Sequence, residues 1–168
     1  KTYYPNGAIE TEGNYTKGVR DGLWTFWYEG EVFEDFGEDG TPNTQDEGEN
    51  NGVWDSTETV VVDLNGNETF DLPLKQMEGS YVLGNREALW TNWYLNGMRK
   101  EEANYSNGKL NGSIIRWHEN GNRSEEGTYE SGKQDGRWVW YYDTGIKKEL
   151  TKFLDGQQNG LWIQWFSD

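Results

Sequence analysis

The carboxylate side chains of Asp and Glu are the groups of this chain best suited to chemistry, and they are densest in one segment. Residues 31–77 contain 13 Asp and Glu and a single basic residue, Lys75. The rest of the chain has 17 acidic and 14 basic residues, so this segment supplies most of the net charge of −15. Such a run of negative charge repels itself and stays extended unless cations neutralise it. The composition alone allows two interpretations, a cation-binding unit or a disordered acidic spacer.

The spacing within this segment favours calcium over the spacer. Two consecutive twelve-residue frames, 35–46 and 47–58, place Gly40 and Gly52 at the sixth position, where a calcium loop turns sharply. A third frame, 63–74, lacks this glycine and the terminal acid. Oxygen ligands at this density suit Ca²⁺ better than softer metals. We predict two to three bound calcium ions, with ligands drawn from Asp35, Asp39, Thr41, Asn43, Asp46, Glu47, Glu49, Asn51, Asp55, Glu58, Asp63, Asn65, Asn67 and Asp71.

The composition excludes several other kinds of site. The chain has no Cys and one His, which rules out disulfides, Cys-ligated metals, Cys nucleophiles and any site that needs two imidazoles. The acidic charge disfavours nucleic acids and anionic membranes, and no apolar run is long enough for membrane insertion. We find no nucleophile motif, phosphate-binding glycine loop or His–carboxylate pair. We therefore expect no catalytic residue and no enzymatic activity.

The acidic segment interrupts a chain that is otherwise built from a 24-residue repeat. Units begin at Gly22, Ala88, Gly112, Gly136 and Gly160, and the last four are spaced by 24 residues. The step from Gly22 to Ala88 is 66 residues, 42 more than one period, so one unit carries a long insertion. Each unit comprises an aromatic strand, a turn, a second strand with one aromatic residue, and a closing glycine. Two strands and two turns leave no room for a helix in a unit of this length.

The predicted fold is all-β, a linear array of stacked antiparallel β-hairpins with one inserted acidic lobe. N-terminal repeats occupy residues 1–30, the insertion occupies 31–77, and C-terminal repeats occupy 78–168 in the same domain as 1–30. Asn-Gly favours two-residue hairpin turns because both of its residues tolerate positive φ. We expect such turns at Asn6-Gly7, Asn96-Gly97, Asn120-Gly121 and, as a variant, Thr144-Gly145.

Aromatic residues recur at two fixed places in the first strand of each unit. One column comprises Trp24, Trp90, Ile114, Trp138 and Trp162. The other column comprises Trp27, Trp93, Trp117, Tyr141 and Trp165. Because three positions separate the two columns, they face opposite sides of a strand. We expect one face to form the core, and a partly open tryptophan row to offer a binding stripe for a protein or a sugar ring.

Two further groups of polar residues have structural interpretations. His118 stands where other units have Tyr, and we expect it to fill that column. The pairs Glu101-Glu102 and Glu125-Glu126 follow the hairpin turns, where acidic residues recur. We expect both pairs to lie on a solvated face and not to act as an acid and a base.

The repeat units resemble the MORN repeat, and more closely its bacterial variant form. The resemblance recurs in every unit and implies an elongated, twisted antiparallel sheet whose hairpins stack through columns of aromatic residues and glycines. The acidic segment resembles the aspartate-rich calcium loops of extracellular modules such as thrombospondin type 3 repeats and dockerins. It departs from them at Gly37, which stands at the third loop position where a ligand is usual, and at Glu47, which stands in place of an Asp.

We predict a non-enzymatic scaffold, extracellular or on the cell surface, that binds a protein partner or another copy of itself end to end. Calcium would order its insertion. Calcium loops of modest quality bind at about 10⁻⁴–10⁻³ M and would be empty in a cytosol, which favours the extracellular location.

The sequence also allows two other functions. Bacterial proteins built from the variant repeats include antitoxins, so one alternative is a cytoplasmic antitoxin or immunity-type protein that neutralises a toxin by binding it. Carbohydrate binding through exposed tryptophan rows is a further alternative.

The last unit ends at residues 165–168 without a second strand, so we expect its edge to be truncated or to pair with a partner.

Overall fold

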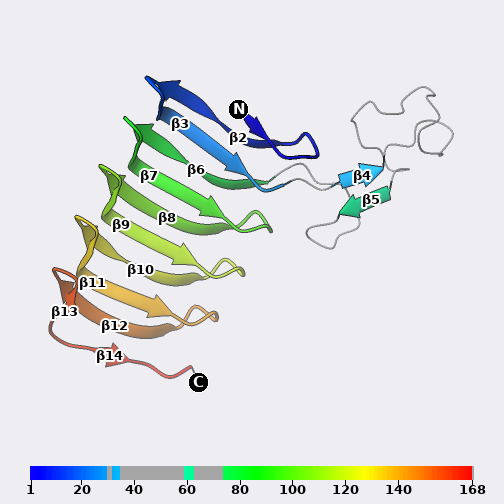
Figure 1. The fold of residues 1–168 in the computed structure, drawn as a ribbon. Coiled ribbons are helices and arrows are strands. Elements are labelled where there is room, and N and C mark those ends of the chain that lie inside the picture. Colours follow the sequence, from blue (N-terminus) through cyan, green and yellow to red (C-terminus); the bar gives the residue numbers. More distant parts are fainter. Residues whose placement is uncertain (30–31, 35–58, 63–73, 168) are drawn as a thin grey trace, which may run out of the picture.

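The computed structural model describes residues 1–29, 32–34, 59–62 and 74–167, and every regular element in these residues is a β-strand. Twelve strands form one antiparallel sheet, while β4 and β5 pair separately (Figure 1). The predicted all-β hairpin array is thus confirmed. The strands are β1 (Thr2–Tyr3), β2 (Ile9–Thr16), β3 (Val19–Trp27), β4 (Val32–Glu34), β5 (Thr59–Val62), β6 (Lys75–Val82), β7 (Asn85–Trp93), β8 (Arg99–Ser106), β9 (Lys109–Trp117), β10 (Arg123–Glu130), β11 (Lys133–Tyr141), β12 (Lys147–Leu154), β13 (Gln157–Gln158) and β14 (Ile163–Gln164).

Strands that follow one another in the main sheet are neighbours, and the sheet runs from β1 to β13 in chain order. β3 and β6 are neighbours in the sheet although β4 and β5 lie between them in the chain. They pair across the long insertion, with Trp27 opposite Lys75. The backbone nitrogen of Tyr28 donates to the Leu74 carbonyl at 2.9 Å, as that of Tyr94 donates to the Met98 carbonyl at 2.8 Å. Residues 29–73 therefore stand where the next unit has only a three-residue turn.

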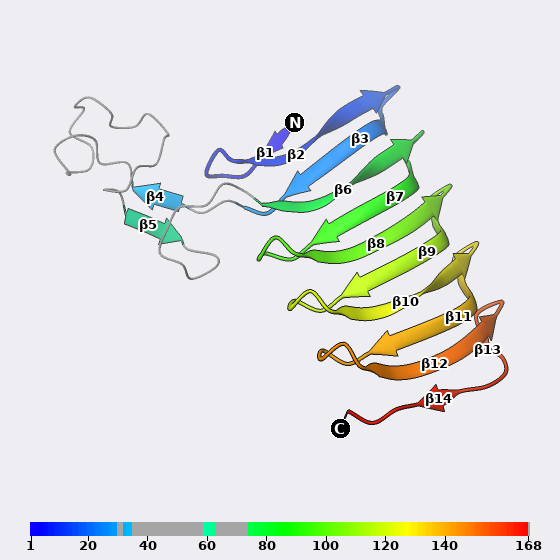
Figure 2. The same cartoon turned by 180° about the vertical axis from the view of Figure 1, so that it is seen from behind.

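Two kinds of turn alternate along the chain, and they line opposite edges of the sheet (Figures 1 and 2). Tight two-residue turns close each unit, and both of their central residues have positive φ, which is the geometry of type I′. The φ angles of Asn107 and Gly108, for example, are 50° and 78°. These turns are Lys17-Gly18, Leu83-Gly84, Asn107-Gly108, Ser131-Gly132 and Asp155-Gly156.

The prediction of two-residue turns at the Asn-Gly pairs is wrong. Gly97 has positive φ but Asn96 does not, and the Gly97 nitrogen donates to the Tyr94 carbonyl at 3.0 Å. The loop thus has three residues, a type I turn followed by a left-handed glycine. The Asn96 side chain explains the difference, because its Oδ1 accepts a hydrogen bond from the Met98 nitrogen at 2.9 Å and so ties the asparagine to the following backbone.

The core is a layer of indole rings lying on glycine backbone. A Cβ added to Gly79 would lie 2.2 Å from the ring of Trp90, and one added to Gly127 would lie 2.3 Å from that of Trp138. Each indole nitrogen also donates to a neighbouring carbonyl, as Trp90 Nε1 does to Ser80 at 3.1 Å. Only glycine lets a tryptophan approach the sheet this closely. A single-layered sheet can therefore bury Trp90 and Trp138 almost completely.

One unit replaces both partners of this contact together. Ala103 takes the glycine position and lies opposite Ile114, which takes the tryptophan position. Both side chains are fully buried. The smaller isoleucine leaves room for the extra methyl group, so this unit keeps a buried contact at the same place.

The last unit departs from this arrangement at Thr151. This threonine is buried in the place that glycine occupies elsewhere, and its side chain excludes an indole from the position above it. Trp162, eleven residues later as Trp138 is after Gly127, is 51% exposed. The chain here forms only β13 and β14, which pair with different parts of β12. The threonine side chain therefore prevents Trp162 from packing on the sheet as Trp138 does.

Candidate functional site

A ladder of hydroxyl groups joins neighbouring units at the edge with the three-residue turns. Tyr28 Oη donates to the Trp93 carbonyl at 2.9 Å, and Tyr94 Oη donates to the Trp117 carbonyl at 2.7 Å. His118 takes the place of a tyrosine, with its Nε2 at 3.2 Å from the Tyr141 carbonyl. Burial raises the pKa of Tyr28 and of Tyr94, with a smaller contribution from a neighbouring residue in each case. His118 is thus part of the packing between units.

The tryptophan row predicted as a binding stripe uses its backbone carbonyls in this ladder. All five side chains of this row are half-buried, and two of them contact charged residues. Lys75 Nζ lies 5.8 Å from the centre of the Trp93 ring, and Tyr141 Oη donates to Glu126 at 2.7 Å. The binding role of these residues stays a prediction. They are Trp27, Trp93, Trp117, Tyr141 and Trp165.

The predicted calcium ligands, from Asp35 to Asp71, all lie outside the described residues. In residues 1–29, 32–34, 59–62 and 74–167, no three His, Asp or Glu side chains converge as they would around a metal ion. The same part of the chain holds no helix of the length and apolarity that crossing a membrane requires.

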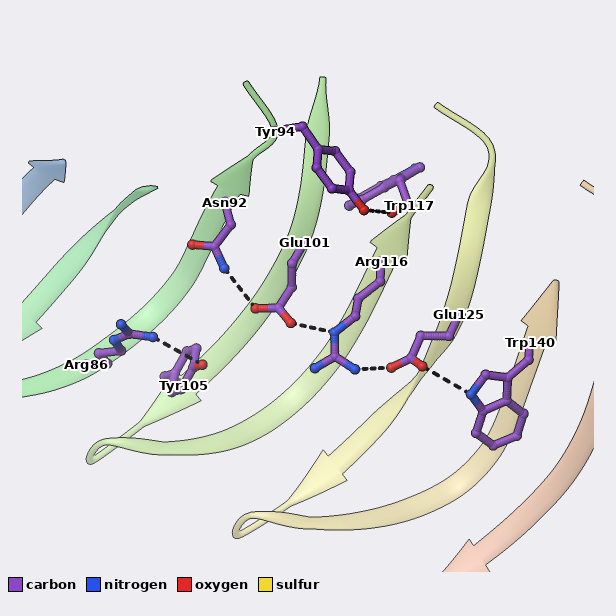
Figure 3. A network of polar contacts seen from close by, with 9 residues as sticks. All are labelled: Arg86, Asn92, Tyr94, Glu101, Tyr105, Arg116, Trp117, Glu125 and Trp140. Carbon is purple, nitrogen blue, oxygen red and sulfur yellow. Dashed lines mark hydrogen bonds and ion pairs between the residues drawn. The ribbon is translucent and has the colours of Figure 1, made fainter. Parts of the chain in front are cut away.

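The face that bears Trp24, Trp90 and Trp138, here called the tryptophan face, also carries a polar network that the sequence did not indicate (Figure 3). Asn92 donates to Glu101 at 3.0 Å, and Arg116 Nε donates to the other oxygen of Glu101 at 2.6 Å. A second nitrogen of Arg116 donates to Glu125, which also accepts a hydrogen bond from Trp140 Nε1 at 3.1 Å.

The expectation of a solvated acidic face is wrong for one residue of each glutamate pair. Glu101 and Glu125 are mostly buried on the tryptophan face, on either side of Arg116. Burial alone would lower the pKa of Arg116, but its hydrogen bond to Glu101 and the charges of both glutamates raise it above the ordinary value. The signal that could have found this network is the arginine itself, which stands in a column occupied elsewhere by Phe26, Asn92 and Trp140.

Arginines also cap the aromatic core in the first two units. The guanidinium carbon of Arg20 lies 4.5 Å from the centre of the Trp24 ring and 5.5 Å from that of Tyr81. Arg86 repeats this arrangement over Trp90 and Tyr105, at 4.3 Å and 5.4 Å. Such cation–π contacts stabilise by about 0.5–2 kcal/mol each. The same column continues with Leu110, Gln134 and Gln158, so the later units have no arginine at this place.

A groove lies beside the aromatic residues of a later unit. It has a volume of about 450 Å³, and its lining includes Glu125, Trp140, Lys148, Glu149 and Phe153. The Trp140 ring packs against Trp138, with centroids 5.7 Å apart, and against Phe153 at 6.3 Å. The groove therefore combines aromatic rings with carboxylates, a combination that suits a cationic group.

Exposed apolar side chains gather on the opposite face, over the first units. Leu23 of β3, Val82 of β6 and Leu89 of β7 are 59%, 50% and 48% exposed. They alternate with residues of the tryptophan face along their strands, so all three point away from it. The repeat does not require an apolar residue here, because the column of Leu23 and Leu89 continues with Ser113 and Arg137 before it ends at Leu161.

Four segments of the chain match a known family of sequence repeats. The family model described as MORN repeat variant matches residues 1–17, 86–107, 110–131 and 134–155. A search of curated proteins finds no match. Three of the matched segments each begin near the start of a strand of the main sheet and extend through the following strand. The chain is a repeat scaffold, and these four segments are repeats of the MORN repeat variant family.

Proposed function

We propose that this protein is a non-enzymatic scaffold that holds a protein partner against the sheet face bearing Leu23, Val82 and Leu89. The observation that carries the proposal is the exposure of these three apolar side chains on neighbouring strands. Apolar groups gathered on a surface gain free energy when a partner removes them from water, at about 25 cal/mol per Å². The serine and arginine at the same place in the next two units favour a local binding surface over a requirement of the fold.

Rigidity of the sheet supports this role. Hydrogen bonds join neighbouring units at both edges, for example from Asn96 Nδ2 to the Glu119 carbonyl at 2.9 Å and from the Gly108 nitrogen to the Arg86 carbonyl at 2.9 Å. A surface whose backbone is already fixed loses less conformational entropy when it binds. A continuous array of repeats offers such a surface over several units.

The proposal extends to calcium and to an extracellular location. Its support is the acidic sequence of residues 31–77, with two twelve-residue frames that have glycine at the sixth position. Calcium sites of this kind fill at extracellular calcium concentrations. In this proposal the ion orders the insertion, and the repeat sheet binds the partner.

Site-specific photo-cross-linking tests the partner surface. A benzoylphenylalanine at position 89 should cross-link a partner in the native host, while the same group at position 113 should not. Position 113 is the matched control, because Ser113 stands one unit later in the same column. The mass of the cross-linked product identifies a second copy, a toxin or another protein. Equal cross-linking from both positions would contradict the proposed surface.

Substitution of the apolar side chains gives a second test. Leu23→Ser together with Leu89→Ser should abolish the cross-link from a probe at Val82. The change in the free energy of unfolding should stay within about 0.5 kcal/mol per site, because both leucines are exposed. An unchanged yield of cross-linked product in a folded double variant would count against the role of this face.

A further inference from the structure

The fourth aromatic cluster of the tryptophan face, Trp138, Trp140 and Phe153, lacks the capping arginine that the first two clusters have. In the first unit the corresponding rings are Trp24, Phe26 and Tyr81, and Arg20 lies over all three. At the position of Arg20 the fourth cluster has Gln134, which carries no charge. Two of the three rings of this cluster, Trp140 and Phe153, line the groove.

A carboxylate without a partner lies next to this cluster. Glu149 is half-buried and lies opposite Trp140 in the pairing of β11 with β12. The two other glutamates of this row are both engaged, Glu101 with Asn92 and Arg116, and Glu125 with Arg116 and Trp140. Within the described part of the chain, the side chain of Glu149 makes no hydrogen bond or ion pair. Lys148, which also lines the groove, has its Nζ 5.7 Å from the centre of the Tyr142 ring.

We propose that this groove binds an arginine side chain of a protein partner. Its guanidinium would lie over Trp140 and Phe153, as Arg20 and Arg86 lie over their own aromatic rings, and would pair with Glu149. Arginine fits better than lysine, because a planar guanidinium stacks on aromatic rings and donates two parallel hydrogen bonds to one carboxylate. The net charge of −15 also attracts a basic partner.

This inference deepens the proposed function by giving the chemistry of the partner, but the groove can be tested without that partner. The probe is a blocked Gly-Arg-Gly peptide, and the readout is the indole N–H signal of Trp140 in ¹⁵N-labelled protein, assigned with Trp140→Phe. We expect a saturable shift with a Kd on the order of millimolar, as suits a single side chain. The same peptide with citrulline, which is neutral and similar in shape, should give no saturable shift. A lysine peptide should bind more weakly than the arginine peptide.

Two variants locate the binding. Glu149→Gln should weaken binding of the arginine peptide about tenfold, the usual scale for loss of a charged hydrogen-bond partner. Glu130→Gln is the matched control and should leave the Kd unchanged, because it removes the same charge from an exposed residue of β10. Gln134→Arg should also weaken binding, because it restores an internal guanidinium at the place of Arg20. No shift of the Trp140 signal, or an equal shift with the citrulline peptide, would overturn the proposal.

Failure of this site and failure of the scaffold are distinguishable. The probe at position 89 lies on the opposite face, so its cross-linking does not require the groove. If cross-linking from position 89 persists and the arginine peptide does not bind, only the arginine site is wrong. If the peptide binds but position 89 captures no protein, the proposed partner surface fails and the groove remains supported.

Discussion

At the scale of single residues, the sheet depends on a steric match between glycine and tryptophan. Gly13, Gly79 and Gly127 each lie under an indole ring so closely that no Cβ fits, and Ala103 appears only where isoleucine replaces the tryptophan. The match explains how a sheet one layer thick buries large side chains without a second layer. It also explains why the aromatic and glycine columns of the sequence have the same period.

We expect Gly127→Ala to destabilise the protein by about 3 kcal/mol, because the added methyl group overlaps the Trp138 ring. Trp138→Ile should cost a similar amount through lost burial. The double variant recreates the natural Ala103 and Ile114 pair, so its cost should be close to that of Trp138→Ile alone. Urea unfolding of the four proteins gives the coupling free energy. Strictly additive effects would show that the two side chains do not compete for space.

At the scale of the strand, bulges decide which residues face the core. A register shift between Gly79 and Ser80 leaves Ala88 with a φ of 59°, a left-handed conformation that other units give to glycine. The corresponding glycines, Gly22 and Gly136, both have a φ of 71°. An alanine in this conformation is strained by about 1–2 kcal/mol.

Ala88→Gly should therefore stabilise the protein, by about 0.5–1 kcal/mol after allowing for the greater freedom of glycine in the unfolded chain. Gly22→Ala is the control with the opposite sign. A Cβ at Gly22 would meet no atom within 4 Å, so its cost reports backbone strain alone. Both changes are measured by urea unfolding. If Ala88→Gly does not stabilise the protein and Gly22→Ala does not destabilise it, the backbone at the bulge carries no strain.

The tyrosine ladder between units makes the stability sensitive to alkaline pH. Burial raises the pKa of Tyr4, Tyr28 and Tyr94 above their ordinary value of 10.0. A pKa that is higher in the folded state means that the folded protein holds the proton more tightly. Its contribution to stability is complete below pH 10 and is lost as the pH rises through the folded pKa.

We expect the free energy of unfolding to fall above pH 10, together with the rise of tyrosinate absorbance. Tyr94→Phe should reduce stability at neutral pH by about 1 kcal/mol, because the hydrogen bond to the Trp117 carbonyl is lost. The same variant should lose less stability than the parent protein as the pH rises. An identical alkaline loss in both proteins would exclude Tyr94 as a contributor.

At the scale of the whole molecule, the acidic insertion enters the repeat sheet at the place of one turn. Tyr28 and Leu74 are hydrogen-bonded as Tyr94 and Met98 are, so residues 29–73 replace a three-residue turn. Excision of 29–73 and its replacement by the Leu-Asn-Gly sequence of Leu95–Gly97 should leave the sheet folded. A large fall in melting temperature would instead mean that the insertion stabilises the sheet.

Calcium titration distinguishes a metal-binding insertion from an acidic spacer. The EDTA-treated protein should bind two to three ions by calorimetry, with a higher melting temperature, because binding to the folded state stabilises it by mass action. The excised variant should bind none. Absence of binding at calcium concentrations of about 1 mM would contradict the calcium proposal and favour the spacer.

The sequence by itself determined the period, the all-β array and the positions of the turns, because these follow from local residue types such as glycine, asparagine and aromatic residues at fixed spacing. Tertiary structure decided the turn type at Asn96, the direction of Glu101 and Glu125, and the caps of Arg20 and Arg86 over the aromatic core. The physical reason for the direction of the two glutamates is the bulge in the second strand of each unit, such as the register shift between Arg123 and Glu125. One extra residue reverses the faces of all residues beyond it, and cross-strand pairing decides where it lies.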